Sequence, residues 1–567
     1  MTSKKSFKNK LDINDKPDFL KGFSSYIIIF LIVTIIYAHT IFFNFTYLDD
    51  NKLILDNFYF LSDISNILKA FQQDVFINTI DNAYYRPIMN ISLMLDAQFS
   101  GTSPFFYHLT NILIHLFCVF FVFSFLLKLG YKRFPSFLFS VFFAVHPALC
   151  QAVAWIPGRN DSLLTLFILL SFIFFINYMS DRKINNLFIH LLFFAFALFT
   201  KETTLISLFL FIFYIRLISL KRVLQRQNIS LFLGWIIITY LWFVMRKSAL
   251  PNPINYSPKD MINSIVSNLP AVFLYIGKTL LPFNLSVLPT LNNNTLIYGY
   301  IVVAVSIFLI CLSKNINRLY ITFGILWFLS FLLPAFIRPD PNLPTAFIEH
   351  RMYLPFIGFM IFLLEAANIK NIVFGKNFAT FLCISILLLF SLINIFYSYN
   401  FKDQITFWEN ARNHSPQYPL ARRNLGAIYY LKGDFDKAKE EYLECVKLNP
   451  AEPMVHNNLG LIYMNRGEFK KAEDEFLTEL KYNPNYDTAY YNLGLLYLRE
   501  GRIQQSINLW KKTIDINPYY FDAYEQLAAL FYILKDYNQS AFYINQAKKR
   551  NGKINPQLLK AMESIKK

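Results

Sequence analysis

The sequence predicts an all-α protein in which a multi-span membrane domain of about 11 transmembrane helices is followed by an α-solenoid of helical repeats. Composition is the first indication, because 55% of the 567 residues are hydrophobic and only 16% are charged, unlike a soluble globular protein. The second is placement, since nearly all long apolar runs lie before residue 400. The third indication is a sequence repeat near the carboxyl terminus, where Pro416, Pro450, Pro484 and Pro518 recur every 34 residues.

Charge and cysteine content exclude two other classes of protein. The net charge of +17 is also found in nucleic-acid-binding proteins, but here many lysines and arginines flank apolar segments, where basic residues orient a membrane protein. We therefore expect a lipid bilayer and no nucleic acid as partner. The five cysteines show no CxxC spacing, so we expect neither a disulfide framework nor a zinc site.

The amino terminus predicts an uncleaved first span. Residues 1–23 are basic and precede an apolar run of about twenty residues that ends in aromatic and Asn residues, without a small-residue cleavage site. A spanning helix needs about twenty mostly apolar residues. The expected spans are 24–43, 106–129, 134–153, 162–179, 186–200, 203–220, 229–246, 296–313, 319–337, 352–369 and 377–398.

One further apolar stretch, 261–283, is interrupted by Pro270, Lys278 and Pro282. The distribution of basic loops favours an interfacial or re-entrant segment here, because a single crossing would place the SKNINR loop outside. With a cytoplasmic amino terminus, the basic loops expected inside are 128–134, 180–186, 219–228, 313–318 and 368–377. This topology places the carboxyl-terminal repeats on the external side.

The carboxyl-terminal third has the tetratricopeptide pattern. Asn424, Asn458 and Asn492 follow the same 34-residue period as the prolines, each before a Leu-Gly pair. About four repeats are expected to stack into a solenoid with a groove for a peptide or partner protein. Alternatively, the repeats only scaffold the membrane domain. The expected divisions are 1–23 cytoplasmic, 24–400 membrane domain, 401–420 docking helix, 421–553 solenoid and 554–567 tail.

Two adjacent carboxylates, Asp49 and Asp50, follow the first predicted span. A carboxylate at headgroup level can take a proton from an acceptor hydroxyl, and an acidic pair can also bind Mg²⁺ or Mn²⁺. The alternative is a solvated loop. We expect one of the two to be a general base, and the sequence leaves open which one.

The other expected external loops contain basic residues, although it is basic residues in cytoplasmic loops that set the orientation of a membrane protein. Arg86 lies between two tyrosines and a proline, and Arg159 lies in the segment HPALCQAVAWIPGRND. Such cations can neutralise a phosphate, although a snorkelling or flanking role is the alternative. The candidate phosphate- or substrate-binding residues are Arg86, His146, Arg159, Asp161, Lys201, Glu202, Glu349 and Arg351, with His350 between the last two.

In order, the segments DD, YYRPI, PFFYHLTNILIH, FAVHPALCQAVAWIPGRND, LFTKET, VMRK, LLPFNLS and EHRMYLPFIGF, followed by the repeats, resemble the transmembrane and tetratricopeptide-repeat (TMTC-type) O-mannosyltransferases and their bacterial relatives. The resemblance implies a GT-C-type glycosyltransferase fold. It also implies an active site on the external face that takes a polyprenyl-phosphate-linked sugar. Matched to the family's motifs, Asp49 or Asp50 is the expected base and the other eight candidates lie near the site.

The chain departs from the animal members in its short repeat array, and its Phe, Ile, Asn and Lys bias suggests a bacterial inner-membrane protein with periplasmic repeats. The leading hypothesis is inverting transfer of mannose or another hexose to Ser or Thr hydroxyls of exported proteins. Alternatives are transfer to a surface glycan or lipid, and a non-catalytic assembly protein.

Overall fold

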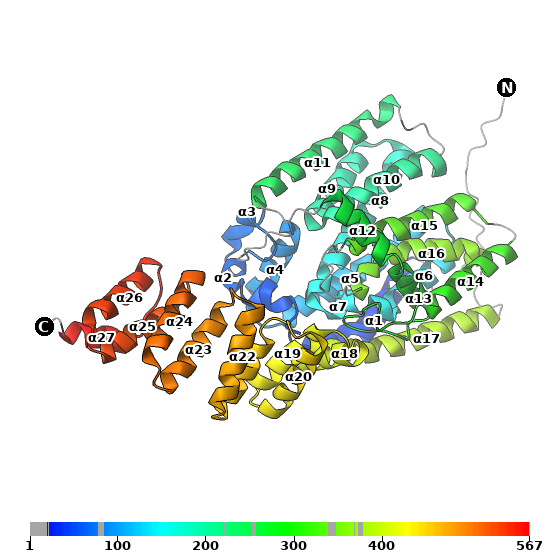
Figure 1. Ribbon diagram of the computed structural model, residues 1–567. Coiled ribbons are helices and arrows are strands. Elements are labelled where there is room, and N and C mark those ends of the chain that lie inside the picture. Colours follow the sequence, from blue (N-terminus) through cyan, green and yellow to red (C-terminus); the bar gives the residue numbers. More distant parts are fainter. Residues whose placement is uncertain are drawn as a thin grey trace, which may run out of the picture. The chain divides into compact units, whose positions relative to one another are not determined.

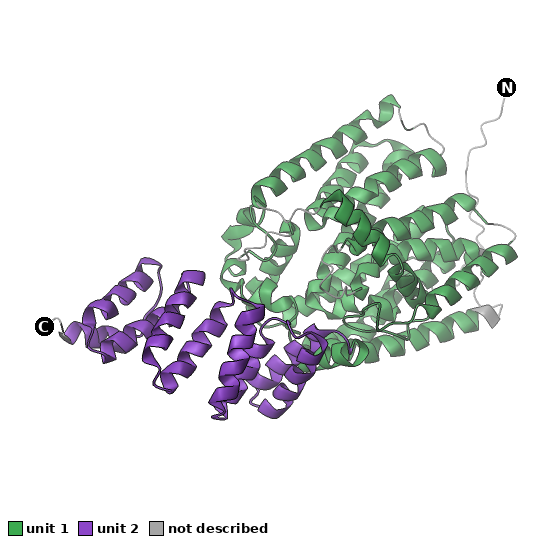
Figure 2. Cartoon of the chain, viewed as in Figure 1, with its two compact units in different colours: residues 1–415 green, residues 416–567 purple. Residues whose placement is uncertain are grey.

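The computed structural model describes residues 20, 22–77, 84–219, 223, 225–251, 257–313, 316–337, 347–367, 369–371 and 378–565. Most of the expected cytoplasmic segment 1–23 lies outside these residues. The chain divides into two compact units, Met1–Ser415 and Pro416–Lys567 (Figure 2). Every regular element in the described part is helical (Figure 1), so the all-α fold class is confirmed.

The first unit contains eighteen α-helices among its described residues, joined by short 3-10 and π-helical turns. They are α1 (Ser24–Tyr37), α2 (Phe58–Leu61), α3 (Ile67–Ala70), α4 (Pro87–Ser100), α5 (Phe105–Lys128), α6 (Arg133–Val145), α7 (Gln151–Ala154), α8 (Arg159–Asp181), α9 (Ile184–Thr200), α10 (Ile206–Phe213), α11 (Ile229–Ala249), α12 (Pro258–Asn268), α13 (Ala271–Leu280), α14 (Ile297–Leu312), α15 (Arg318–Leu332), α16 (Pro355–Ala366), α17 (Phe378–Ser398) and α18 (Gln404–His414).

Six helical segments of the described chain are long and apolar enough to cross a membrane. They are Ser24–Phe42, Phe105–Lys128, Ile156–Asp181, Arg226–Ala249, Arg318–Phe336 and Thr380–Phe401. The other expected spans also contain helices, of which α9, α14 and α16 are apolar but shorter. The count of eleven therefore stays a prediction. The stretch 261–283 forms the tail of α12 and the short α13.

The seventh possible span is bent. Helix α6 and the segment Pro147–Ala154 meet at 57°. The break falls at His146, whose backbone is extended (φ −68°, ψ 120°), because the residue before a proline is pushed out of the helical region. The bend turns the chain into the connection that leads to Arg159 and Asp161 at the start of α8.

Helices α15 and α16 cross in close contact because each has a glycine at the crossing. A Cβ on Gly324 would lie 2.6 Å from the Gly358 carbonyl oxygen, and one on Gly358 would lie 2.4 Å from that of Gly324. Small residues let helix backbones approach in a bilayer. This crossing fixes the start of α16, next to the candidate residues 349–351.

The second unit is a stack of helix pairs (Figure 1). Gly426, Gly460 and Gly494 face the aromatic rings of Tyr442, Phe476 and Trp510 of the paired helices, with no room for a Cβ. The repeat architecture is therefore confirmed, and a further helix pair, α25 and α26, follows these three. Its helices are α19 (Pro419–Leu431), α20 (Phe435–Leu448), α21 (Val455–Asn465), α22 (Phe469–Tyr482), α23 (Asp487–Arg499), α24 (Ile503–Ile516), α25 (Phe521–Ile533), α26 (Tyr537–Lys549) and α27 (Pro556–Ile565).

Candidate functional site

The acidic pair lies in the turn that follows α1. Asp50 is only 1% exposed, and its Oδ2 accepts hydrogen bonds from the Thr46 backbone N–H (2.6 Å) and hydroxyl (3.1 Å), while Oδ1 accepts from the Asn51 N–H (3.2 Å). Burial raises the pKa of Asp50 to about 6, against the lowering effect of the Thr46 hydrogen bonds. Asp49 is partly exposed. Asp50 therefore holds the turn, and Asp49 is the residue of the pair that is more exposed to solvent.

A third acidic residue, Asp161, lies in the first turn of α8. Both of its oxygens accept from the Lys201 ammonium, at 2.8 and 2.9 Å, and Oδ2 lies 3.6 Å from His350 Nε2. Lys201 follows the end of α9 and His350 precedes α16. Because the Lys201 and His350 side chains are 15% and 12% exposed, part of each can contact a ligand.

Arg86 lies at the start of α4 beside the Lys201 segment. Its guanidinium lies 3.5 Å from Glu202 Oε1 and 4.4 Å from the centre of the Tyr84 ring. With the Asn160 amide oriented to satisfy its hydrogen bonds, its oxygen accepts from Arg86 Nη1 at 3.2 Å and its nitrogen donates to the Thr200 carbonyl. The Glu202 side chain is 43% exposed, so this ion pair is loose and open to solvent.

Trp155 connects the acidic turn to the basic residues. Its indole N–H donates to the Thr46 hydroxyl (3.0 Å), and its ring centre lies 5.4 Å from that of His350. The connected residues come from the ends of α1 and α9 and the starts of α4, α8 and α16. We name this group the polar cluster; it consists of Asp49, Asp50, Arg86, Asp161, Lys201, Glu202 and His350.

Arg159 is buried among α4, α5 and α8, and in the part of the chain that the structure describes its side chain makes no hydrogen bond or ion pair with the polar cluster. Its side chain is fully buried and lies 2.5 Å from Asp96 Oδ2. The remaining donors bond to the Asn111 side chain (2.7 Å), the Tyr107 carbonyl (2.6 Å) and Ser92. With its donors engaged inside the protein, Arg159 joins α4, α5 and α8, and we leave it out of the phosphate-binding set.

We expect Arg159→Met to lower the free energy of unfolding by about 3–5 kcal/mol, because it leaves the Asp96 carboxylate buried without its counterion. The measurement is the thermal midpoint of the full chain in detergent. Adding Asp96→Leu should restore part of the loss, since both charges are then removed. As a matched control, Lys183→Met breaks an exposed pair with Asp181 and should change little. Equal midpoints for Arg159→Met and Lys183→Met would contradict this role.

Glu349 is also held inside the protein. It is fully buried, and its Oε1 accepts from the Lys278 ammonium (2.5 Å) and the Ser286 N–H (3.1 Å), while Oε2 accepts from the Tyr397 hydroxyl (2.9 Å). These contacts join α13, α17 and the turn before α16. Within the segment 349–351, it is His350 that reaches the polar cluster.

His146 and Arg351 also bond to backbone carbonyls of other segments. His146 is fully buried, with Nε2 3.0 Å from the Thr279 carbonyl and Nδ1 accepting from the Ala148 N–H at 3.3 Å. It thereby stabilises the bend before Pro147. Arg351 donates to the Ala335 carbonyl at 3.3 Å.

Sequence reasoning missed two residues, Trp155 and Lys278, that hold segments of the candidate site in place. Trp155 lies inside the HPALCQAVAWIPGRND segment, but nothing in the spacing showed that its indole would reach Thr46. In the sequence, Lys278 stands out only as an interruption of an apolar stretch. A lysine in such a stretch is itself a signal, because an ionisable residue there needs a partner, and Glu349 is that partner.

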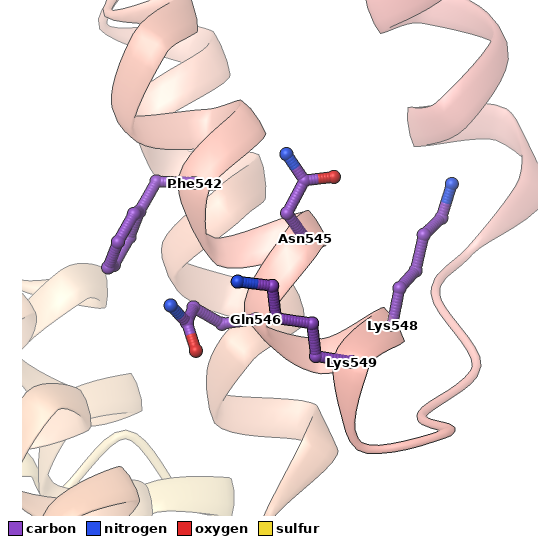
Figure 3. A pocket seen from close by; sticks show the side chains of 5 residues that line it. All are labelled: Phe542, Asn545, Gln546, Lys548 and Lys549. Atoms are coloured by element: carbon purple, nitrogen blue, oxygen red, sulfur yellow. The ribbon is translucent and has the colours of Figure 1, made fainter.

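The part of the chain that the structure describes contains no group of three or more His, Cys, Asp or Glu side chains placed to hold one metal ion. A hollow on the repeat unit is lined by Phe542, Asn545, Gln546, Lys548 and Lys549, all from α26. Figure 3 shows Asn545 and Lys548 pointing away from Phe542. These divergent side chains do not form a catalytic group.

Comparison with known proteins adds two findings. A TPR repeat model matches residues 426–467, and a tetratricopeptide repeat model matches residues 457–521. Among curated proteins, the chain is 28% identical over 176 residues to the protein O-mannosyl-transferase Tmtc1 of Drosophila melanogaster, covering 30% of this chain and 20% of that protein. It is 37% identical over 98 residues to human TMTC2, which covers 17% of this chain and 12% of that protein. It is 32% identical over 149 residues to human TMTC3, which covers 25% of this chain and 16% of that protein. Both relatives are also named as protein O-mannosyl-transferases.

The matched regions span about a fifth or less of these relatives' lengths. Among solved structures, the crystal structure of MamA is similar at 24% identity and a TM-score of 0.24, over 26% of this chain and 86% of that one. The curated relatives confirm the expected resemblance to the TMTC-type protein O-mannosyl-transferases, and the two family models confirm tetratricopeptide repeats in the carboxyl-terminal unit.

Proposed function

We propose that the chain is a membrane glycosyltransferase that moves a hexose from a polyprenyl-phosphate donor to Ser or Thr hydroxyls of exported proteins. The observation that carries the proposal is the polar cluster, in which a reachable carboxylate and several basic side chains gather at the ends of apolar helices. The relatives named as protein O-mannosyl-transferases support the class of reaction and make mannose the first sugar to test.

Asp49 is the general base in this proposal, because a base must come within hydrogen-bond reach of the proton that it removes. Asp50 is engaged by Thr46 and Asn51 and holds the turn. Arg86 and Lys201 neutralise the donor phosphate, with His350 beside them.

The reaction is a single displacement with inversion. The acceptor hydroxyl gives its proton to Asp49, and its oxygen forms a bond to the anomeric carbon. The bond between that carbon and the phosphate oxygen breaks, and the electron pair leaves with the lipid phosphate. The additional negative charge on the phosphate is stabilised by Arg86 and Lys201.

The cluster faces the periplasm of a bacterial inner membrane, where polyprenyl-phosphate sugars present their headgroups, and the repeats select the acceptor protein. Confirmed tetratricopeptide helices support this role, because stacked repeats form extended binding surfaces.

The test is transfer in vitro by the purified full chain in detergent, with polyprenyl-phosphate mannose, other polyprenyl-phosphate hexoses, and Ser- or Thr-containing peptides. Glycosylated peptide, detected by mass spectrometry, supports the proposal. Labelling of a glycan or lipid in place of peptide would change the acceptor class. No transfer to any acceptor, with cells unaffected by Asp49→Asn, would favour the assembly-protein alternative.

A further inference from the structure

Thr46, four residues before Asp50, uses all of its polar atoms in one junction. It is 2% exposed, and its N–H and hydroxyl both donate to Asp50 Oδ2. Its carbonyl accepts from the Trp408 indole N–H at 3.1 Å, and its hydroxyl oxygen accepts from the Trp155 indole N–H at 3.0 Å. We name these four residues the Thr46 junction. Through it, two tryptophans from distant parts of the sequence fix one acidic turn.

The two tryptophans are rigidly placed. Trp155 is 2% exposed and Trp408 is fully buried, and Phe407 packs against both, with its ring centre 6.5 Å from that of Trp155 and 5.2 Å from that of Trp408. A short backbone contact strengthens the same arrangement, because the Asn44 N–H donates to the Lys402 carbonyl at 2.8 Å. The turn after α1 therefore rests directly on the segment that contains α18.

Helix α18 is itself anchored to the first unit. The Asn410 side-chain oxygen accepts from the Val287 N–H at 3.1 Å, and the Ser415 hydroxyl donates to the Leu288 carbonyl at 2.7 Å. The amino-terminal end of α18 is closed by Asp403, which accepts from two backbone N–H groups of the first turn. A helix that is capped at its first turn and bonded to residues 287 and 288 near its last turn is a firm support for the turn that contains Asp49 and Asp50.

We propose that Thr46 and Trp408 are positioning residues for the transfer reaction, and that α18, the helix immediately before the repeats, is part of the construction of the catalytic turn. The inference rests on the proposed function, in which Asp49 is the base. The two residues act through Asp50 and the turn, without touching substrate. A displacement of about 1 Å at a reacting group lowers a rate by about 10²-fold, so loosening this junction should slow the chemical step.

The experiment measures hexose transfer by the full chain carrying Thr46→Val, Thr46→Ser or Trp408→Phe. Valine keeps the shape and the backbone N–H but removes the hydroxyl that bridges Trp155 and Asp50, so we expect kcat to fall by about 10- to 100-fold with both KM values unchanged. Serine keeps the hydroxyl and should restore most of the rate. Phenylalanine at 408 removes only the indole N–H and bicyclic bulk, and about a tenfold loss in kcat is expected.

A matched control is Trp235→Phe, which removes a buried indole N–H bonded to His190 (2.9 Å) on other helices of the same unit. Its kcat should stay near that of the wild type. The thermal midpoint is measured for each variant, and if Trp408→Phe does not fold, the Thr46→Val and Thr46→Ser pair decides. In an Asp49→Asn background, Thr46→Val should cause little further loss, because the base that it positions is gone.

Two failures can be told apart. If the wild-type chain transfers no hexose, or Asp49→Asn transfers as well as the wild type, the proposed function fails. If Asp49→Asn abolishes transfer but Thr46→Val keeps the wild-type kcat, or Thr46→Ser is as slow as Thr46→Val, only the positioning role is overturned.

Discussion

Asp49→Asn is expected to lower the rate of hexose transfer by about 10²- to 10⁴-fold, the usual contribution of a general base. An asparagine has nearly the size of the aspartate but cannot take the acceptor proton. KM for the polyprenyl-phosphate donor should stay unchanged, because in the proposed mechanism Asp49 contacts the acceptor hydroxyl and not the phosphate. The measurement is the initial rate of peptide glycosylation with the purified chain.

Two further variants make this result specific. Asp50→Asn weakens the bonds from Thr46, so we expect a smaller loss in rate together with a lower thermal midpoint. Asp56→Asn changes an exposed carboxylate in the same stretch and should leave the rate unchanged. A larger loss in rate for Asp50→Asn than for Asp49→Asn would assign the base to Asp50, and equal activity of all three would exclude an acidic base in this turn.

Arg86→Ala is expected to lower kcat/KM by about 10²- to 10³-fold, as removal of one preorganised donor at a developing negative charge does. The Arg86 guanidinium is only loosely paired with Glu202 at 3.5 Å and can turn toward a phosphate. Arg86→Lys should recover only part of the activity, because an ammonium lacks the planar fork that binds two phosphate oxygens. The measurement is transfer at several donor concentrations.

The control for this prediction is Arg318→Ala, which removes an exposed arginine at the start of α15 and should not change transfer. The loss in transfer rate caused by Arg86→Ala should also be larger at low than at high donor concentration. The reason is that Arg86 contacts the phosphate in the bound donor as well as in the transition state. An Arg86→Ala protein that folds and keeps the wild-type kcat/KM would remove Arg86 from the phosphate site.

The fold was largely predictable because its signals are local and repeated. The 34-residue period fixes the helix pairs, since each Leu-Gly pair must meet an aromatic ring of the neighbouring helix, as Gly460 meets Phe476. Long apolar runs locate the membrane helices. Helix bounds were less predictable, because the stretch 203–220 is broken into α10 and a π-helical turn at Tyr214–Ile218.

The sequence offers candidate residues for the site, but it does not show which of them lie together. Arg159 and Lys201 look alike in the sequence, since each is a basic residue near a predicted span end. Only the fold shows that Arg159 meets Asp96 from another helix, whereas Lys201 stays at the partly exposed edge of the cluster. The Thr46 junction joins residues more than three hundred positions apart, and such pairings depend on how helices pack.

The assignment of α18 to the first compact unit determines where this chain can be recombined. A graft that exchanges the repeats of one homologue for those of another should be spliced between Ser415 and Pro416. A splice directly after α17 would replace α18 together with the repeats. The membrane unit would then lose Trp408, whose indole N–H bonds to Thr46. If the proposed function holds, a graft spliced between Ser415 and Pro416 should change the acceptor without slowing the transfer step, whereas a graft that includes α18 should also slow transfer.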